Sequence, residues 1–363
     1  MRILTVFGTR PEIIKLAPVI QALKERGQTV TVCASGQHRD MLDQMLPIFG
    51  ITPDCDLDVM QENQSPLEVA ARILEQLPPV LEKFKPDWLL VQGDTTTTLA
   101  AAWVSFHQRT PIAHIEAGLR TSDKFRPFPE EMNRRLTSIL SDLHFAPTPR
   151  AVENLIREGV PETRIFMTGN TVVDALQAIL RCPVSFSDPR LTGLGGRVIL
   201  MTAHRRESFG QPLQQICQAI SELVSSYSDL TVVFPVHRNP TVRKTVHALL
   251  GNQPRIVLTE PLPYPQFVHL MGRADLILTD SGGIQEEAPT IGTPVFVLRE
   301  VTERPEAIES GWAELLGTSS DAIVARVRGW LDDRQNGLPR SGLNPFGDGC
   351  ASQRILEILM TIK

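Results

Sequence analysis

Short, nearly continuous apolar runs recur along the chain, and each is bounded by glycine, proline or small polar residues. Such runs are typical of parallel strands that are buried on both faces of a sheet. The runs are 3–7, 30–33, 88–92, 112–115, 143–145 and 164–168 in the first half, and 198–201, 231–234, 256–258, 276–279 and 295–298 in the second. Helical segments of about 10–20 residues separate them, which indicates doubly wound parallel sheets. The pattern therefore predicts an α/β protein with two Rossmann-like domains.

The segment 182–196 separates the two sets of strands, and it holds two prolines, three glycines and little periodicity. This composition is typical of a linker. We therefore predict an N-terminal domain at 1–170 and a C-terminal domain at 171–349, with a last helix at about 350–363 that packs back on the first domain. Two such domains facing one another would form a cleft lined by the residues that follow their strands.

The turn Ser281-Gly282-Gly283 joins a predicted strand to a predicted helix. Because the two glycines lack a Cβ, backbone N–H groups can approach a ligand there, and the helix N-terminus favours an anion, most often a phosphate. Glu286 and Glu287 follow in the helix, and a carboxylate beside a phosphate can accept two hydrogen bonds from a ribose diol. An ordinary tight turn with solvent-facing glutamates is the alternative, and the residues alone leave both open.

Three carboxylates follow strands of the first half, at the edge where open α/β sheets bind their ligands. Asp94 comes after the strand at 88–92, Glu116 after the strand at 112–115, and Glu130 after a proline-rich loop. Together they could act as acid and base groups. The alternative is structural in each case: Asp94 would cap the threonine-rich helix, Glu116 would pair with an arginine, and Glu130 would cap its own helix.

Basic side chains also gather near strand ends, although the formal net charge of the whole chain is −5. A locally basic cleft suits a diphosphate, and the forked guanidinium groups of arginine suit its oxygens. For Arg10 the alternative is a solvated residue at the start of a helix. The residues concerned are Arg10, Lys15, Arg120, Arg134, His204, His237 and Arg304.

Composition excludes several other classes of protein. A content of 42% hydrophobic and 21% charged residues is ordinary for a globular protein, and the negative net charge argues against a general nucleic-acid binder. The five cysteines show neither CxxC nor metal-ligand spacing, so we expect no metal site and reduced thiols in the cytoplasm. The chain begins directly with a strand, and no apolar run approaches the roughly 18 residues of a membrane span. We therefore expect neither a membrane span nor a signal peptide.

Nine motifs occur in order along the chain: GTRPE (8–12), QHRDMLD (37–43), GDTTTT (93–98), HIEAGLR (114–120), PEEMNR (129–134), AHRRESFG (203–210), PVHRNP (235–240), LTDSGGIQEEAP (278–289) and TERPE (302–306). Each motif alone is weak, but the set is specific. Over essentially the whole chain it resembles the bacterial non-hydrolysing UDP-N-acetylglucosamine 2-epimerases. The chain departs from the family pattern at Ala203, where glycine is usual, and at Asp40.

The resemblance implies a GT-B-like pair of domains, a homodimer, and reversible conversion of UDP-GlcNAc to UDP-ManNAc, which supplies precursors of surface polysaccharides. In that reaction the C1–O bond to UDP breaks, a proton leaves C2, and a 2-acetamidoglucal forms. Re-addition of UDP with protonation on the opposite face gives the epimer. No hydride moves, so no cofactor is expected, in agreement with the absence of a GxGxxG fingerprint from the turn at 8–12.

The resemblance also assigns roles to residues. Asp94, Glu116 and Glu130 would serve proton transfer and charge stabilisation, and His204 and Arg134 would steady the diphosphate and the departing oxygen. UDP would bind mainly to the C-terminal domain, with Glu287 on the ribose hydroxyls and Phe267 at the uracil; an ordinary core phenylalanine is the alternative for Phe267. The other residues predicted to bind substrate or UDP are Arg10, Lys15, His237, Ser281, Gly282, Gly283 and Arg304.

Other functions share parts of this pattern. An epimerase of a modified UDP-sugar, such as a UDP-diacetamido uronic acid, would share the mechanism and differ in a few side chains around the sugar. A GT-B glycosyltransferase would share the nucleotide-binding half but would need an acceptor groove. A non-catalytic sensor of sugar nucleotides would not need the carboxylates.

Overall fold

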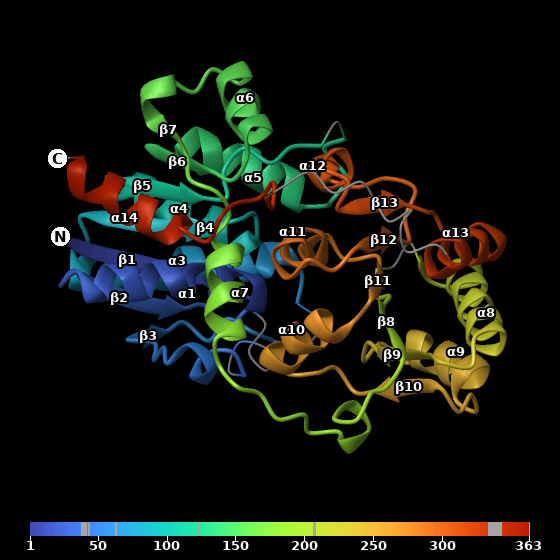
Figure 1. Ribbon diagram of the computed structural model, residues 1–363. Coiled ribbons are helices and arrows are strands. Elements are labelled where there is room, and N and C mark those ends of the chain that lie inside the picture. The colour runs from blue at the N-terminus through green and yellow to red at the C-terminus, as the bar shows by residue number, and fades with distance from the viewer. Residues whose placement is uncertain are drawn as a thin grey trace. The chain divides into compact units, whose positions relative to one another are not determined.

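The computed structural model describes residues 1–37, 42, 44–61, 64–121, 123–205, 208–332 and 343–362. The chain forms two compact units: unit 1 comprises Met1–Ala175 and Phe346–Lys363, and unit 2 comprises Leu176–Pro345. Each unit is a parallel sheet with helices on both faces (Figure 1), so the predicted α/β class with two doubly wound sheets is confirmed. Asp40, most of the QHRDMLD motif, and residues 206–207 of the AHRRESFG motif lie outside the described residues.

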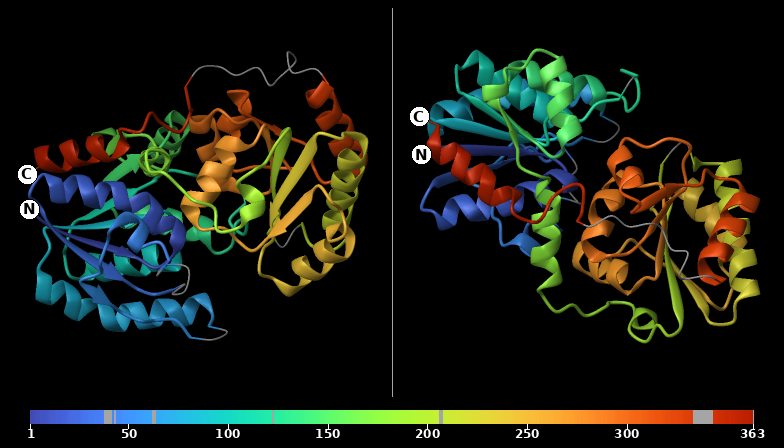
Figure 2. Two further views of the ribbon diagram at one scale, coloured as in Figure 1. Left: turned by 60° about the horizontal axis from the view of Figure 1, so that its bottom comes forward. Right: turned by 45° about the horizontal axis from the view of Figure 1, so that its top comes forward.

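The sheet of unit 1 has seven parallel strands in the order β3-β2-β1-β4-β5-β6-β7. Helices α1 and α14 pack together on one face, and α3, α4 and α5 cover the other (Figure 2). The elements are β1 (Arg2–Phe7), α1 (Arg10–Glu25), β2 (Thr29–Ala34), β3 (Cys55–Asp56), α3 (Pro66–Phe84), β4 (Trp88–Gln92), α4 (Thr96–His107), β5 (Ile112–Ile115), α5 (Glu130–Leu140), β6 (Leu143–Ala146), α6 (Pro149–Arg157), β7 (Ile165–Met167), α7 (Thr171–Leu180) and α14 (Ala351–Thr361).

The sheet of unit 2 has six parallel strands in the order β10-β9-β8-β11-β12-β13. Helices α8, α9 and α13 pack against one another on one face, and α10 and α11 pack together on the other. The elements are β8 (Arg197–Thr202), α8 (Gln211–Ser226), β9 (Leu230–Pro235), α9 (Pro240–Leu250), β10 (Ile256–Thr259), α10 (Tyr264–Arg273), β11 (Leu276–Thr279), α11 (Gly282–Ile291), β12 (Val295–Val297), α12 (Pro305–Glu309), β13 (Ala313–Leu315) and α13 (Ser320–Asp332).

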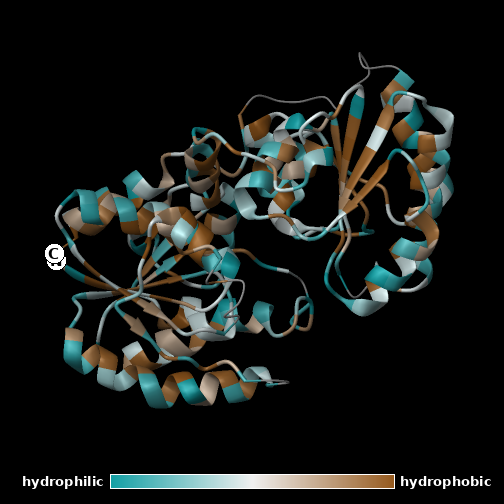
Figure 3. Ribbon diagram, turned by 90° about the horizontal axis from the view of Figure 1, so that it is seen from below, coloured by the Kyte–Doolittle hydropathy of each residue, from teal (hydrophilic) through white to brown (hydrophobic). Residues whose placement is uncertain are grey.

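The apolar runs form the interior of each unit. All residues of β5 and of β11 are buried, as expected for strands covered on both faces. Figure 3 shows the largely hydrophobic strands, whereas the helices alternate between hydrophobic and hydrophilic residues. Two strands, β3 and β13, were not predicted. Each is a short strand at the edge of its sheet, and neither carries a long apolar run.

In each sheet the strand order changes direction at one point, called the switch point. Open α/β sheets bind their ligands beside such a point. The reversal lies between β1 and β4 in unit 1 and between β8 and β11 in unit 2. At such a point the loops after the two strands diverge to opposite faces of the sheet, which leaves a crevice at the carboxyl ends of the strands. The candidate site residues of each unit should therefore lie after these pairs of strands.

Asp174 of α7 joins the last helix of the chain to unit 1. Its largely buried carboxylate accepts hydrogen bonds from the backbone N–H of Ala351 (3.2 Å) and Ser352 (2.8 Å) and from the Ser352 hydroxyl (2.5 Å). Backbone N–H groups in the first turn of a helix have no acceptor within the helix, so Asp174 caps α14 across a gap of 177 residues in sequence. No helix in the described part of the chain is both long and apolar enough to cross a membrane.

We expect Asp174→Ala to loosen α14, because its first turn would lose the acceptor for three donors. The amides of α14 should exchange with solvent about 10-fold faster, which corresponds to about 1.4 kcal/mol, a typical loss for a helix cap. Hydrogen exchange followed by mass spectrometry measures this. Asp321→Ala is the control, because Asp321 is an exposed acidic residue in the first turn of α13. Unchanged exchange in α14 would contradict the capping role.

Candidate functional site

The switch point of unit 1 is held together by a buried carboxylate. Glu12 in α1 accepts hydrogen bonds from the N–H of Gly8 (3.0 Å) and Thr9 (2.8 Å), which form the turn before its own helix. Its second oxygen accepts from the hydroxyls of Thr95 (2.8 Å) and Thr98 (3.1 Å) at the start of α4. Glu12 therefore fixes the loops after β1 and β4 relative to each other. Burial raises the pKa of Glu12, although these hydrogen bonds lower it.

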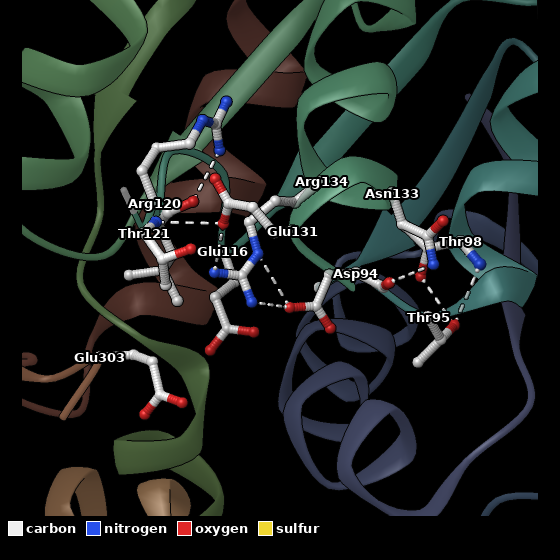
Figure 4. A network of polar contacts seen from close by, with 12 residues as sticks. Asp94, Thr95, Thr98, Glu116, Arg120, Thr121, Glu131, Asn133, Arg134 and Glu303 are labelled. Atoms are coloured by element: carbon white, nitrogen blue, oxygen red, sulfur yellow. Dashed lines mark hydrogen bonds and ion pairs between the residues drawn. The ribbon is translucent and has the colours of Figure 1, made fainter. Parts of the chain in front are cut away.

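Asp94 lies two residues after the end of β4 and is bound by residues of α5 (Figure 4). The Nε of Arg134 donates to Asp94 Oδ2 at 3.0 Å, and its Nη2 contacts the same oxygen. Asn133 donates to the backbone carbonyl of Asp94 at 2.9 Å. The cap of α4 is the side chain of Thr95, which accepts from the N–H of Thr98, so the alternative that Asp94 caps this helix is wrong.

Arg134 lies between two carboxylates, because its Nη1 also reaches Glu131 at 3.3 Å. Glu131 is completely buried and additionally binds the N–H of Thr121 (3.1 Å) and the Nε of Arg135 (2.8 Å). Arg134 was predicted to steady a diphosphate; in the structure its contacts orient Asp94 (Figure 4). Glu130 is the first residue of α5 and is half-buried, and the N-cap position of this helix is Pro129.

Glu116 follows β5 and has a left-handed backbone conformation (φ +65°), which is uncommon for a residue with a side chain. Its Oε1 contacts the Lys15 ammonium of α1 and accepts from Asn170 Nδ2 at 2.9 Å. Its Oε2 accepts from Gln92 Nε2 at 2.5 Å. Glu116 therefore pairs with a lysine rather than with the arginine considered as the structural alternative. Four separate segments bring these donors and the carboxylate together.

Asp94 and Glu116 lie at the same point of the sheet edge. Gly93, the neighbour of Asp94, has a positive φ of +74°, and a Cβ added there would lie 3.4 Å from Glu116 Oε2. His114 Nε2 donates to the Gly93 carbonyl at 2.7 Å, and this hydrogen bond helps to fix the turn at Gly93. Arg10 begins α1 at the same edge, and its side chain is exposed.

In unit 2 the predicted turn is the start of α11. Ser281 is the N-cap, and the helix begins at Gly282 rather than at about Ile284 as predicted. A Cβ on Gly282 would lie 3.2 Å from the Arg304 guanidinium carbon, so Arg304 rests on this glycine. A Cβ on Gly283 would meet its nearest atom only at 4.0 Å, so packing within the chain does not require a glycine at 283.

Glu286 and Glu287 are buried, so the alternative of solvent-facing glutamates is wrong. Glu286 accepts from Arg304 Nε at 2.8 Å, and Glu287 accepts from the Tyr264 hydroxyl at 2.9 Å. These contacts fix the Arg304 side chain over the first turn of α11 and orient the Glu287 carboxylate. Phe267 lies on α10 and is half-buried.

His204 and His237 follow β8 and β9, and their ring centres lie 6.0 Å apart. The Nδ1 of His204 lies 2.9 Å from Asp280 Oδ1, and the Nδ1 of His237 accepts from the Asn239 N–H at 3.3 Å. Both histidines, the α11 N-terminus and Arg304 therefore follow strands at the carboxyl edge of one sheet.

Several residues of the two sites were not predicted to have a role there. Gln92, Asp280 and Asn170 sit beside predicted residues or directly after a strand, so their positions alone could have identified them. Glu131 is adjacent to Glu130 in sequence. The sequence does not show that Glu131 is the one that is completely buried. Nothing in the sequence indicates that Tyr264 contacts Glu287. The described residues contain no cluster of three or more side chains suited to a metal ion.

Comparison with known proteins agrees with the motifs. A family model described as UDP-N-acetylglucosamine 2-epimerase matches residues 21–360. The chain is 50% identical to the UDP-N-acetylglucosamine 2-epimerase of Salmonella typhimurium over 374 residues, which cover 100% of this chain and 99% of the relative. It is also 50% identical to the enzyme of that name from Escherichia coli K12, over 99% of this chain and 98% of the relative.

Solved structures give the same result. The UDP-GlcNAc 2-epimerase from Neisseria meningitidis bound to UDP-GlcNAc has a TM-score of 0.93 and 45% identity, with 100% of both chains covered. The UDP-GlcNAc 2-epimerase from Methanocaldococcus jannaschii in complex with UDP-GlcNAc and UDP has a TM-score of 0.84 and 34% identity, again with full coverage. The glycosyltransferase of kitacinnamycin, at 16% identity and a TM-score of 0.66 over 99% of this chain and 98% of that chain, shares the fold alone.

Two buried histidines beside the site make the stability depend on pH. His114 and His144 are register partners on β5 and β6, and the Nδ1 of each is buried without a hydrogen bond to any of the described residues. Burial, the largest cause, lowers the pKa of His114 to about 4 and that of His144 to about 3. Unfolded, each imidazole takes up a proton near pH 6.5. Their contribution to stability is therefore complete above pH 6.5 and is lost as the pH falls toward 4 and 3.

We expect His144→Asn to make the free energy of unfolding less dependent on pH. Between pH 7 and pH 5 the wild-type protein should lose roughly 2 kcal/mol more than this variant, because only the wild type must keep this imidazole neutral. Denaturant unfolding at both pH values measures the difference. His247→Asn, at an exposed position on α9, is the control. An equal pH dependence in the wild type and in His144→Asn would contradict the assignment.

Proposed function

The chain belongs to the UDP-N-acetylglucosamine 2-epimerase family, a family of isomerases, and from this membership we propose that it interconverts UDP-GlcNAc and UDP-ManNAc at C2. The reaction proceeds by elimination of UDP to a 2-acetamidoglucal and re-addition. Its location in the cytoplasm and a role in supplying surface polysaccharide precursors stay predictions.

The pair of carboxylates at the switch point of unit 1 carries this proposal, because the two are held differently. Glu116 is mostly buried and has three donors: Lys15, Gln92 and Asn170. These three donors fix the position of the carboxylate. The side-chain contacts of Asp94 to other described residues all end on Oδ2, and none of them engages Oδ1.

The chemistry needs both kinds of carboxylate. The C2 hydrogen of the sugar is not acidic until the C1–O bond breaks, sends its electron pair to the β-phosphate oxygen of UDP, and leaves positive character at C1. The Glu116 carboxylate, held by its three donors, would stabilise this positive centre. Asp94 would take the C2 proton, and Glu130 would serve the opposite face when UDP adds back to the glucal.

Unit 2 would bind the UDP. The N-terminus of α11 and the N–H groups of the turn Ser281-Gly282-Gly283 suit phosphate oxygens. Glu287, oriented by Tyr264, would accept hydrogen bonds from the ribose hydroxyls. His204 would donate from Nε2 to the departing phosphate oxygen. The remaining residues proposed for UDP or its sugar are Arg10, Lys15, Arg134, His237, Phe267 and Arg304.

We expect the protein to form UDP-ManNAc carrying deuterium at C2 when it is incubated with UDP-GlcNAc in D₂O without an acceptor. Elimination followed by protonation from solvent requires this label, whereas hydrolysis or transfer to an acceptor does not produce it. Asp94→Asn, Glu116→Gln and Glu130→Gln should each lower the rate by about 10²–10⁴-fold, the range for a positioned acid or base. NMR identifies the product and its label.

Glu153→Gln is the matched control, because Glu153 is an exposed carboxylate on α6 and should not affect the rate. Product without deuterium at C2 would exclude elimination. Normal turnover in all three site variants would exclude the carboxylates from the chemistry. The three losses should not be added, because groups that act as a unit are not independent.

We further propose that the protein is a homodimer through an apolar surface on α4 and α5, two helices that pack against each other. Trp103 and Phe106 of α4 are 49% and 57% exposed, and Leu136 and Ile139 of α5 are 37% and 78% exposed. Large apolar side chains gathered on neighbouring helices are typical of a protein interface. A second copy of the chain is the partner that the family resemblance favours, and a two-fold interface would pair this surface with itself.

We expect the wild-type protein to have twice the mass of one chain by light scattering, and the double variant Phe106→Glu/Ile139→Glu to have the mass of a single chain. The introduced carboxylates would have to be buried against apolar side chains, which is costly. Leu67→Glu is the control: Leu67 is 81% exposed at the start of α3. A monomeric wild type, or a double variant that stays dimeric, would contradict this interface.

A further inference from the structure

Asp280 follows β11 directly, and its carboxylate is completely buried. Its Oδ2 accepts hydrogen bonds from the backbone N–H of His204 (2.9 Å) and Arg205 (2.9 Å) and from the Ser208 hydroxyl (3.0 Å). Its Oδ1 lies 2.9 Å from Nδ1 of the His204 ring. One carboxylate therefore holds both the backbone and the imidazole of His204, across 76 residues of sequence.

The contact with Asp280 sets which nitrogen of the His204 ring carries hydrogen. Burial raises the pKa of Asp280, but the hydrogen bonds from His204 and from the backbone outweigh it and lower the pKa below its usual value. At neutral pH the group is therefore a carboxylate, which can only accept. The Nδ1 of His204 must then carry a hydrogen, whether the ring is neutral or protonated. Nε2 is left as the ring atom that can meet a ligand.

The surroundings of His204 suit an anionic ligand. Its side chain is 41% exposed, whereas Asp280 is 0% exposed and cannot itself touch a ligand. The His237 ring lies 6.0 Å away, and the first turn of α11 begins two residues after Asp280. A buried carboxylate behind an imidazole fixes the orientation of the ring in front of it. The same arrangement orients the histidine in catalytic triads.

We propose that Asp280 is the positioning residue of His204: it holds Nδ1–H and aims Nε2 at the phosphate oxygen that leaves C1. This proposal rests on the proposed function. In the elimination step the electron pair of the C1–O bond moves to the phosphate oxygen, and when both nitrogens of the His204 ring carry hydrogen, Nε2–H donates a hydrogen bond to that oxygen. No proton needs to leave the ring, and Asp280 stays ionised throughout.

Asp280→Asn changes the contact to the ring and little else. The amide oxygen can take the place of Oδ2 and accept from the same two backbone N–H groups and from Ser208. The amide NH₂ takes the place of Oδ1, and because it donates, it cannot accept from Nδ1–H. The neutral His204 ring should therefore switch to the tautomer that carries hydrogen on Nε2.

Nitrogen NMR of the protein labelled with ¹⁵N-histidine tests the tautomer without turnover. We expect the neutral His204 ring to carry hydrogen on Nδ1 in the wild type and on Nε2 in Asp280→Asn, with His204→Gln used to assign the signal. Asp229→Asn is the control, because Asp229 binds Arg197 elsewhere in unit 2. A wild-type ring without hydrogen on Nδ1 would overturn the proposal, and so would an unchanged ring in Asp280→Asn.

A double-mutant cycle separates positioning from a merely structural role. Asp280→Asn alone should lower kcat for deuterium incorporation at C2 by roughly 10²-fold, within the range for a positioned acid or base. In a His204→Gln background the same substitution should lower kcat by less than about 2-fold, because its effect passes through the ring. Equal losses in both backgrounds would overturn the proposal.

The proposed function can fail separately from this inference. A wild-type protein that incorporates no deuterium at C2 would remove the epimerase reaction while the NMR result still decides the His204 tautomer. Should Asp280→Asn fail to fold, the tautomer of the wild-type ring remains decisive by itself.

Discussion

Backbone N–H groups in the first turn of a helix need acceptors, and the two switch points of this chain meet that need in opposite ways. In unit 1 the protein supplies acceptors itself: Glu12 accepts from the N–H groups of Gly8 and Thr9 at the start of α1, and the Thr95 side chain accepts from the Thr98 N–H at the start of α4. In unit 2 the Ser281 side chain makes no capping hydrogen bond within the described chain, and Asp280 accepts from the neighbouring loop at His204 instead. The two parallel sheets therefore differ at the carboxyl ends of their strands: carboxylates gather there in unit 1, whereas groups that suit an anion gather there in unit 2.

The apolar runs predicted the central strands of both sheets because a parallel strand buried on both faces must be apolar along its whole length. The two strands that they missed, β3 and β13, lie at sheet edges and have only two and three residues. Neither shows an apolar run, because an acidic residue interrupts each, whereas the other two edge strands, β7 and β10, fall within predicted runs. The start of α11 was placed too late because glycine is a poor helix former, whereas here Gly282 and Gly283 form its first turn.

The candidate site was predictable where its residues directly follow strands, as Asp94, Glu116, His204 and the turn 281–283 do. The motifs that carry the family resemblance contain these same residues. The reasoning from strand ends and the resemblance to the family therefore select the same candidate site residues. The sequence did not reveal the hydrogen-bond and ion-pair partners of these residues. Lys15 and Glu116 are 101 residues apart, and Arg134 and Asp94 are 40 apart. These residues meet because their strands and helices are neighbours in the folded sheet. The order of strands in a sheet cannot be read from the hydrophobic pattern or from local capping rules.

The last helix adds a constraint on how the molecule is made. Unit 1 consists of residues from both ends of the chain, since α14 packs on α1 and is capped by Asp174, while unit 2 lies in between. During synthesis on the ribosome unit 2 is therefore complete before unit 1 can close, because domains fold as their residues emerge. Until residues 351–361 have emerged, the face of α1 that α14 covers stays open. A nascent chain would expose apolar surface there, which makes the interval between the folding of unit 2 and the docking of α14 the step at which a chaperone would be most useful.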